Sequence, residues 1–232
     1  MKINDKALIK TKAFINGEWV ESDNKETFPV INPATGEVIA EVASCGSEET
    51  NIAIESAEKA RKDWSAVSVK ERANILRTWF ELMMEVQEDL AQLLTAEQGK
   101  PLFEARGEIA YGATFIEWFA EEGKRVYGDL IPPPSQDKRI IVTKQPVGVV
   151  ACITPWNFPN AMLTRKIAPA LAAGCTVVCK PANATPLSAL AICELATRAG
   201  IPEGVINIVA GRTSEIGEAL TASPLVRKLT FT

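Results

Sequence analysis

Residues 145–183, QPVGVVACITPWNFPNAMLTRKIAPALAAGCTVVCKPAN, contain two short apolar runs on either side of a segment with helical spacing. Val147–Thr154 and Thr176–Lys180 are the apolar runs, and their β-branched residues are typical of buried strands. Ala161–Ala173, which lies between them, has the apolar periodicity of a helix. A strand, a helix and a strand of these lengths form a βαβ unit with parallel strands. The expected fold class is therefore α/β.

The same alternation continues to residue 232. Leu187–Ala199 and Glu215–Thr221 have helical patterns, and they alternate with the strand-like runs Val205–Val209 and Lys228–Phe231. We expect residues 147–232 to form an open, parallel, Rossmann-like sheet with helices on its faces. Ligands bind beyond the carboxyl ends of the strands in such sheets, and the sequence ends at that edge. We therefore expect this part of the sheet to be truncated and its ligand site to be incomplete.

The N-terminal part, residues 1–126, is expected to form a hairpin and a helical layer that belong to the same domain. Phe14–Val20 carries Asn-Gly between two apolar runs, which favours a tight hairpin turn. Asn32–Gly36 is predicted to form a second turn.

Three helices are predicted in the rest of this part. Ser47 is the expected N-cap of the first. A single apolar stripe over residues 75–94 predicts the second, which ends at Gly99 and Pro101 because glycine and proline stop helices. The third is expected to span roughly Leu102–Val126.

Residues 127–146 are expected to form a projecting arm. Pro132–Pro134 interrupts regular structure, and Arg139–Lys144 resumes as an extended segment. We interpret the arm as an oligomerisation hairpin, and we expect the intact protein to be a homo-oligomer, either a dimer or a tetramer.

The composition excludes several classes of function. None of the 232 residues is histidine, which rules out Ser-His-Asp triads, Cys-His dyads and histidine-containing zinc sites. The net charge of −4 argues against nucleic acid as a partner, because such proteins need clustered Lys and Arg. No apolar run approaches the roughly 18 residues that cross a bilayer, and the N-terminus lacks the core of a signal peptide. We expect a cytosolic protein with no metal and no membrane partner.

The five cysteines are expected to be reduced thiols. Cys152, Cys175, Cys179 and Cys193 lie in apolar strand or helix patterns, so they are predicted to pack in the core. Cys45, between Ser and Gly, is the one for which the sequence leaves exposure open, and no neighbouring residue would lower its pKa.

The turn TPWNFP, residues 154–159, follows the first strand of the series and precedes a helix. Its two prolines and its tryptophan make it stiff, and Asn157 offers an amide at the ligand edge of the sheet. Such an amide can donate a hydrogen bond to a developing oxyanion without being ionised. The pattern is equally compatible with Asn157 acting only as the cap of the following helix.

Lys180 and Asn183 occupy the same position after the next strand. A lysine at a strand end can bind phosphate or ribose hydroxyls, and the neighbouring amide can bind the same sugar. The alternative interpretation of Lys180 is a solvated surface charge. Neither of the two commonest phosphate-binding glycine motifs is present, and the spacing from Gly211 to Gly217 is weak evidence for a third.

Together these blocks resemble the aldehyde dehydrogenase superfamily, and the resemblance covers essentially the whole chain. The matching motifs are Ile15–Trp19, Asn32–Gly36, Gln145–Val150, Pro155–Pro159, Pro169–Cys175, Lys180–Ala182 and Pro224–Thr232.

The resemblance implies that Asn157 stabilises the oxyanion of a thiohemiacetal and that Lys180 holds the adenine-side ribose or its 2′-phosphate. Family members that prefer NAD tend to carry glutamate where this sequence has Asn183, so the implied cofactor is NADP, with NAD as the alternative. The implied cofactor-binding residues are Ile153, Thr154, Pro155, Trp156, Asn157, Lys180, Pro181, Ala182, Asn183, Thr213 and Phe231.

Within the superfamily, Val126–Asp129 and Ala161–Lys166 resemble the succinate-semialdehyde dehydrogenase branch. The resemblance implies that Arg165 contacts the carboxylate of the substrate, which suits bidentate pairing by guanidinium. The alternatives are that Arg165 forms a structural ion pair on its helix, or that the substrate is another aldehyde.

The family's cysteine nucleophile and glutamate general base lie beyond the strand at which the sequence ends. The catalytic domain is therefore expected to be absent, and residues 1–232 alone are predicted to be inactive. The alternative from another functional class is a non-catalytic module that binds nucleotide or contacts other subunits.

Overall fold

The computed structural model describes residues 2–232 and confirms the α/β fold class. Its main sheet has six strands, and the four that come from the C-terminal half are parallel. The predicted strands and helices of residues 147–232 are all present, with ends within two residues of those expected. In spatial order the strands are β10 (Val226–Phe231), β7 (Val149–Ile153), β8 (Thr176–Lys180), β9 (Ile206–Ile208), β1 (Ala13–Ile15) and β2 (Glu18–Val20).

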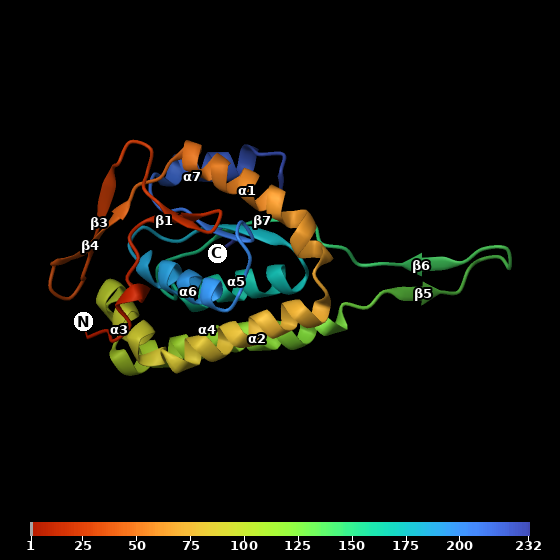
Figure 1. The fold of residues 1–232 in the computed structure, drawn as a ribbon, viewed down its shortest axis with the longest axis horizontal. Coiled ribbons are helices and arrows are strands. Elements are labelled where there is room, and N and C mark those ends of the chain that lie inside the picture. Colours follow the sequence, from red (N-terminus) through yellow and green to blue (C-terminus); the bar gives the residue numbers. More distant parts are fainter. Residues whose placement is uncertain (1) are drawn as a thin grey trace.

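Helices cover both faces of this sheet (Figure 1). On one face lie α1 (Ser47–Ala66) and α7 (Thr213–Ala222), which contact each other. On the other lie α5 (Ala161–Ala172) and α6 (Leu187–Arg198), which follow β7 and β8 along the chain. Strand β8 is buried along its whole length because both of its faces are covered.

A further helical layer packs outside α5 and α6, on the side away from the sheet (Figure 1). It consists of α2 (Val69–Glu85), α3 (Gln87–Gln98) and α4 (Leu102–Glu122). The prediction of a single helix over the apolar stripe is wrong. The chain forms two helices there, divided at Val86, whose ψ of 24° lies outside the helical range. The stripe continues across the break because α2 and α3 bury their apolar sides in the same core.

Two helix ends also differ from expectation. Ser47 is not the N-cap of α1, because Gly46 occupies that position and Ser47 is already helical. The carboxylate of Glu49 accepts a hydrogen bond from the Gly46 amide at 2.7 Å, which fixes the residue at which the helix starts. Helix α4 stops at Glu122, and the chain continues to Arg125 as a 3-10 turn.

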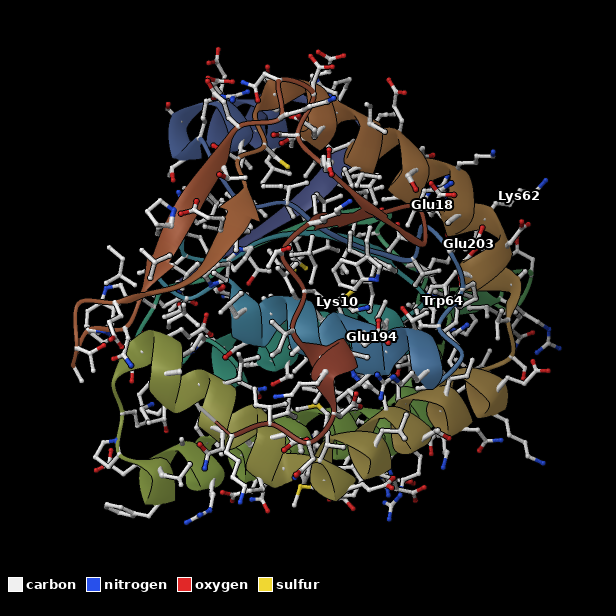
Figure 2. All side chains as sticks on the ribbon, turned by 60° about the vertical axis from the view of Figure 1, so that its left-hand side comes forward. Lys10, Glu18, Lys62, Trp64, Glu194 and Glu203 are labelled. Carbon is white, nitrogen blue, oxygen red and sulfur yellow. The ribbon has the colours of Figure 1, made fainter. Side chains whose placement is uncertain are left out.

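The N-terminal hairpin β1–β2 forms as predicted, with Asn16 and Gly17 at positive φ in its turn. The sequence pattern did not predict that β1 pairs antiparallel with β9 and so extends the main sheet. Lys10 joins this edge to α6, since its Nζ lies 3.0 Å from the Glu194 carboxylate and 4.9 Å from the Trp19 ring centroid. Figure 2 shows Lys10 and Glu194 together beside α6.

Two small two-stranded sheets lie outside the main sheet. Strands β3 (Thr27–Ile31) and β4 (Val38–Ala43) flank the predicted turn at Asn32–Gly36. Strands β5 (Asp129–Ile131) and β6 (Ile140–Val142) form an exposed hairpin that extends away from the rest of the molecule (Figure 1). The division of the chain at residues 126 and 146 stays a prediction.

All five cysteines are buried free thiols, Cys45 included. The amide of Cys45 donates to the Ala210 carbonyl at 2.8 Å. This backbone pairing with the segment before α7 places Cys45 in the protein interior. Burial raises the pKa of the Cys45 thiol to about 12. Across residues 2–232, we find no helix with the length and apolarity that a membrane span requires.

Candidate functional site

The site lies at the carboxyl ends of the parallel strands, where three residues from neighbouring strands stand in one row. Phe231 of β10 is in register with Ile153 of β7, which is in register with Lys180 of β8. The Thr154 amide donates to the Lys180 carbonyl at 3.2 Å and extends the pairing of β7 and β8 into the next loop. Three segments of the predicted cofactor site therefore meet at one edge.

Residues 154–160 form the loop after β7, and its middle faces solvent. Thr154 is buried, Trp156 is 59% exposed and Asn157 is also exposed. The interpretation of Asn157 as a helix cap is wrong, because α5 begins at Ala161 and Asn160 holds the N-cap position. The amide of Asn157 is thus available at the sheet edge, and its catalytic role stays a prediction.

Helix α4 and Lys100, two residues before its first residue, hold this loop from the outer side. Lys100 Nζ donates to the Asn157 carbonyl at 3.0 Å and lies 3.8 Å from the ring centroid of Phe158. Glu108 accepts hydrogen bonds from the amides of Asn160 at 3.0 Å and Ala161 at 3.3 Å.

Sequence reasoning missed both Lys100 and Glu108. A signal was present, because Glu108 shares the buried face of its helix with Ala105, Ile109 and Gly112. A carboxylate among small and apolar residues at helical spacing indicates a buried acid that needs a partner.

Lys180 is only 5% exposed, so its interpretation as a surface charge is wrong. Its Nζ donates to the Pro181 carbonyl and to Oδ1 of Asn183, each at 3.2 Å. Burial lowers the pKa of the lysine, because desolvation disfavours the charged form. Asn183 in turn donates to the Gly211 carbonyl at 2.6 Å, which ties the end of β8 to the segment before α7.

The remaining predicted cofactor residues occupy different environments around this edge. Thr213, at the first position of α7, is exposed, and Phe231 is 72% exposed. Pro181 is buried, whereas Pro155 and Ala182 are half-buried.

Arg165 is not in the strand-end row but on α5, where it faces α4. Its guanidinium carbon lies 4.8 Å from the Phe115 ring centroid, and its Nη2 donates to the Tyr111 hydroxyl. Its Nε is buried without a hydrogen-bond partner among residues 2–232. No carboxylate in the described part of the chain pairs with it, so the interpretation as a structural ion pair is wrong. Arg165 also lines a cavity of about 430 Å³ beside α5, β7 and β10.

No group of three or more Cys, Asp or Glu side chains within residues 2–232 could hold a metal ion. The expectation that the site needs no metal stays a prediction.

Comparison with known proteins gives one consistent result. The model of the aldehyde dehydrogenase family matches residues 19–232. The chain is 61% identical to a glutarate-semialdehyde dehydrogenase of Pseudomonas aeruginosa over 232 residues, which are all of this chain and 48% of that protein. It is 60% identical to the NADP(+) succinate-semialdehyde dehydrogenase of Escherichia coli, with the same coverage.

The structural comparison agrees with the sequence comparison. A crystal structure of an NADP-dependent enzyme from E. coli superposes with a TM-score of 0.98 at 60% identity, covering 99% of this chain and 48% of that one. The chain thus spans about half the length of the relatives that it matches. Since the family model covers the strand-end row and both loops, the chain belongs to the aldehyde dehydrogenase family.

Proposed function

We propose that residues 1–232 form the cofactor-binding part of an NAD(P)-dependent aldehyde dehydrogenase that oxidises an aldehyde with a second, anionic group. The observation that carries this proposal is that the loop after β7 exposes Asn157, while the end of β8, the neighbouring parallel strand, buries the amine of Lys180. Aldehyde, water and oxidised cofactor give the carboxylic acid and reduced cofactor.

Asn157 is the proposed oxyanion donor. When a thiolate attacks the aldehyde carbon, a sulfur–carbon bond forms and the carbonyl π electrons move to the oxygen. The Asn157 amide donates a hydrogen bond to that oxygen, and such donors contribute strongly where water is excluded. The cofactor supplies the acceptor for the hydride that then leaves the carbon.

The thiolate is proposed to come from outside residues 1–232. All five cysteines are buried, and burial raises the thiol pKa of Cys45, Cys179 and Cys193. A buried thiol with a raised pKa is a poor nucleophile. We therefore expect these residues alone to bind cofactor weakly and to oxidise no aldehyde.

Lys180 and Asn183 are the proposed ligands of the adenine-side ribose. A buried amine beside a neutral amide suits a ribose 2′-phosphate, because the uncharged side chain of Asn183 does not repel it. This favours NADP, which is also the cofactor in the name of the 60% identical E. coli relative. Separate titrations with NADP and NAD test the choice, and a clear preference for NAD would exclude it.

Succinate semialdehyde is the proposed substrate, with glutarate semialdehyde as a longer homologue. Two relatives are named for these aldehydes, and both compounds carry a carboxylate. Arg165 supports an anionic substrate because its charge has no carboxylate partner among residues 2–232 and its Nε has no hydrogen bond there.

A chimera tests the function directly. Residues 1–232 would be followed by the part of the E. coli relative that lies beyond the matched residues. We expect it to reduce NADP with succinate semialdehyde, and Asn157→Ala to lower kcat by about 10²–10³-fold. Asn51→Ala, an exposed asparagine of α1, is the control that should leave kcat unchanged. No turnover by the unsubstituted chimera, or full turnover by Asn157→Ala, would overturn the proposal.

The same chimera tests Arg165. Arg165→Leu should raise KM for succinate semialdehyde by about 10- to 100-fold, because a charge-assisted hydrogen bond is lost. The KM for propanal, which has no carboxylate, should stay the same. An unchanged KM for succinate semialdehyde would show that Arg165 does not bind the substrate.

A second candidate function is a non-catalytic module that contacts other subunits. The β5–β6 hairpin favours it, because Leu130 and Ile141 on opposite strands are 72% and 69% exposed. Exposed apolar patches mark association surfaces, so we propose that this hairpin mediates homo-oligomerisation in either case. Analytical ultracentrifugation of residues 1–232 tests it, and a strict monomer at all concentrations would exclude it.

A further inference from the structure

Lys100 and Glu108 form a buried ion pair that serves the loop after β7. Lys100 Nζ lies 2.5 Å from Glu108 Oε2, and the two side chains are 8% and 1% exposed. In the twelve other ion pairs among residues 2–232, both side chains are more exposed, as Arg106 and Glu88 are at 45% and 50%. A buried pair is retained only where its remaining hydrogen-bonding groups also have partners.

Those remaining groups all reach the loop. Lys100 binds the carbonyl oxygen of Asn157 and faces the ring of Phe158. The second oxygen of Glu108 binds the amides of Asn160 and Ala161. The contacts therefore fix the backbone that follows the Asn157 side chain, from its own carbonyl to the amide of Ala161.

Asn157 depends on this support because it is exposed and its side chain forms no hydrogen bond with residues 2–232. The backbone of the loop therefore sets the position from which the Asn157 side chain projects. Oxyanion stabilisation requires the donor to be placed within a few tenths of an ångström, since a looser site loses most of the gain.

We infer that Lys100 and Glu108 are positioning residues for the Asn157 amide. This inference rests on the proposed function, since it assigns the pair to the same oxyanion site. The pair acts through the backbone: Lys100 holds the carbonyl of residue 157, Glu108 holds the start of α5, and the ion pair locks the two contacts together.

Turnover of the chimera is the first test. Lys100→Met and Glu108→Gln should each lower kcat by about 10- to 100-fold, with KM for NADP and for succinate semialdehyde changed less than about threefold. Glu88→Gln, which removes the exposed ion pair of the same helix region, is the matched control and should leave kcat unchanged. A parallel rise in both KM values with kcat preserved would overturn the inference.

A double-mutant cycle separates positioning from general stability. In the Asn157→Ala background, Lys100→Met should cause no further loss of kcat, because the group that it positions is absent. A purely structural role would give additive losses. If Asn157→Ala itself has no effect, the proposed function fails; if it has its effect and the losses add, only the positioning inference fails.

Amide hydrogen exchange of residues 1–232 needs no turnover and covers the case in which Glu108→Gln folds poorly. Lys100→Arg keeps the positive charge but replaces the compact ammonium with a planar group. We expect it to raise the exchange rates at Asn160 and Ala161 by at least about tenfold, while the strand amides of Val177 and Val178 stay protected. Unchanged exchange at Asn160 and Ala161 would contradict the inference.

Discussion

Helices α5 and α6 begin in the same way, since each receives a buried glutamate from the outer helical layer. Glu108 binds the amides of Asn160 and Ala161 at the start of α5. Glu97 binds two amides in the first turn of α6, at 2.7 and 2.8 Å. A carboxylate at a helix N-terminus satisfies unpaired amides and faces the positive end of the helix dipole.

The two glutamates differ in whether a positively charged side chain is paired with them. Glu108 is paired with Lys100, whereas Glu97 forms no ion pair among residues 2–232. Burial raises the pKa of Glu97 to about 7, in spite of its two amide donors. Both glutamates therefore bind the amides at a helix start, but they differ in charge. Glu108, at the loop that carries Asn157, has a fixed counter-ion, whereas Glu97, at the loop that follows Lys180, has none and titrates near neutral pH.

Removing one member of the Lys100–Glu108 ion pair is expected to change the unfolding free energy most. Glu108→Gln leaves the Lys100 ammonium buried without its counter-ion, which costs about 3–5 kcal/mol of unfolding free energy. Urea unfolding of residues 1–232 and of the variant measures it. A loss below about 1 kcal/mol would mean that Lys100 escapes to solvent and that the pair does not lock the loop.

The pH dependence of stability distinguishes Glu97. Its pKa is raised in the folded state above the ordinary value of 4.5. The contribution of protonated Glu97 to the unfolding free energy is therefore complete below pH 4.5 and is lost as the pH rises through about 7. The stability advantage over Glu97→Gln should therefore shrink by about 3 kcal/mol between these limits. Unfolding midpoints of both proteins across this range test it, and a constant or growing difference would contradict it.

Packing at the start of α5 gives a smaller effect. A Cβ on Gly112 would lie 2.2 Å from Oδ1 of Asn160, whereas a Cβ on Gly107 of the same helix meets nothing within 4 Å. Gly112→Ala should cost about 1–3 kcal/mol through overpacking. Gly107→Ala should stabilise the helix by about 0.5–1 kcal/mol. Thermal unfolding of both variants measures the pair, and equal shifts would show that α4 and α5 have room to separate.

A substitution in the exposed β5–β6 hairpin should change the unfolding free energy least. Ile141→Lys replaces a side chain that is 69% exposed, so the unfolding free energy should change by less than about 0.5 kcal/mol. Self-association measured by ultracentrifugation should nevertheless weaken. A large loss of stability in a monomeric sample would mean that the hairpin supports the fold itself.

Much of the fold followed from local sequence pattern. The βαβ series of residues 147–232 was predictable because β-branched runs and helical spacing each depend on neighbouring residues. The break at Val86 was not, since two helices that bury the same side leave an uninterrupted apolar stripe. The pairing of β1 with β9 was also hidden, because it joins residues almost two hundred positions apart.

For the site, the sequence alone determined which groups stand at the strand ends: Asn157 after β7 and Lys180 after β8. Only the tertiary structure decided that Lys180 is buried, that Arg165 faces Tyr111, and that Lys100 and Glu108 hold the Asn157 loop. The reason is physical. Strand and helix periods are set over a few residues, whereas the burial and pairing of a charge depend on which distant side chains the packed fold brings beside it.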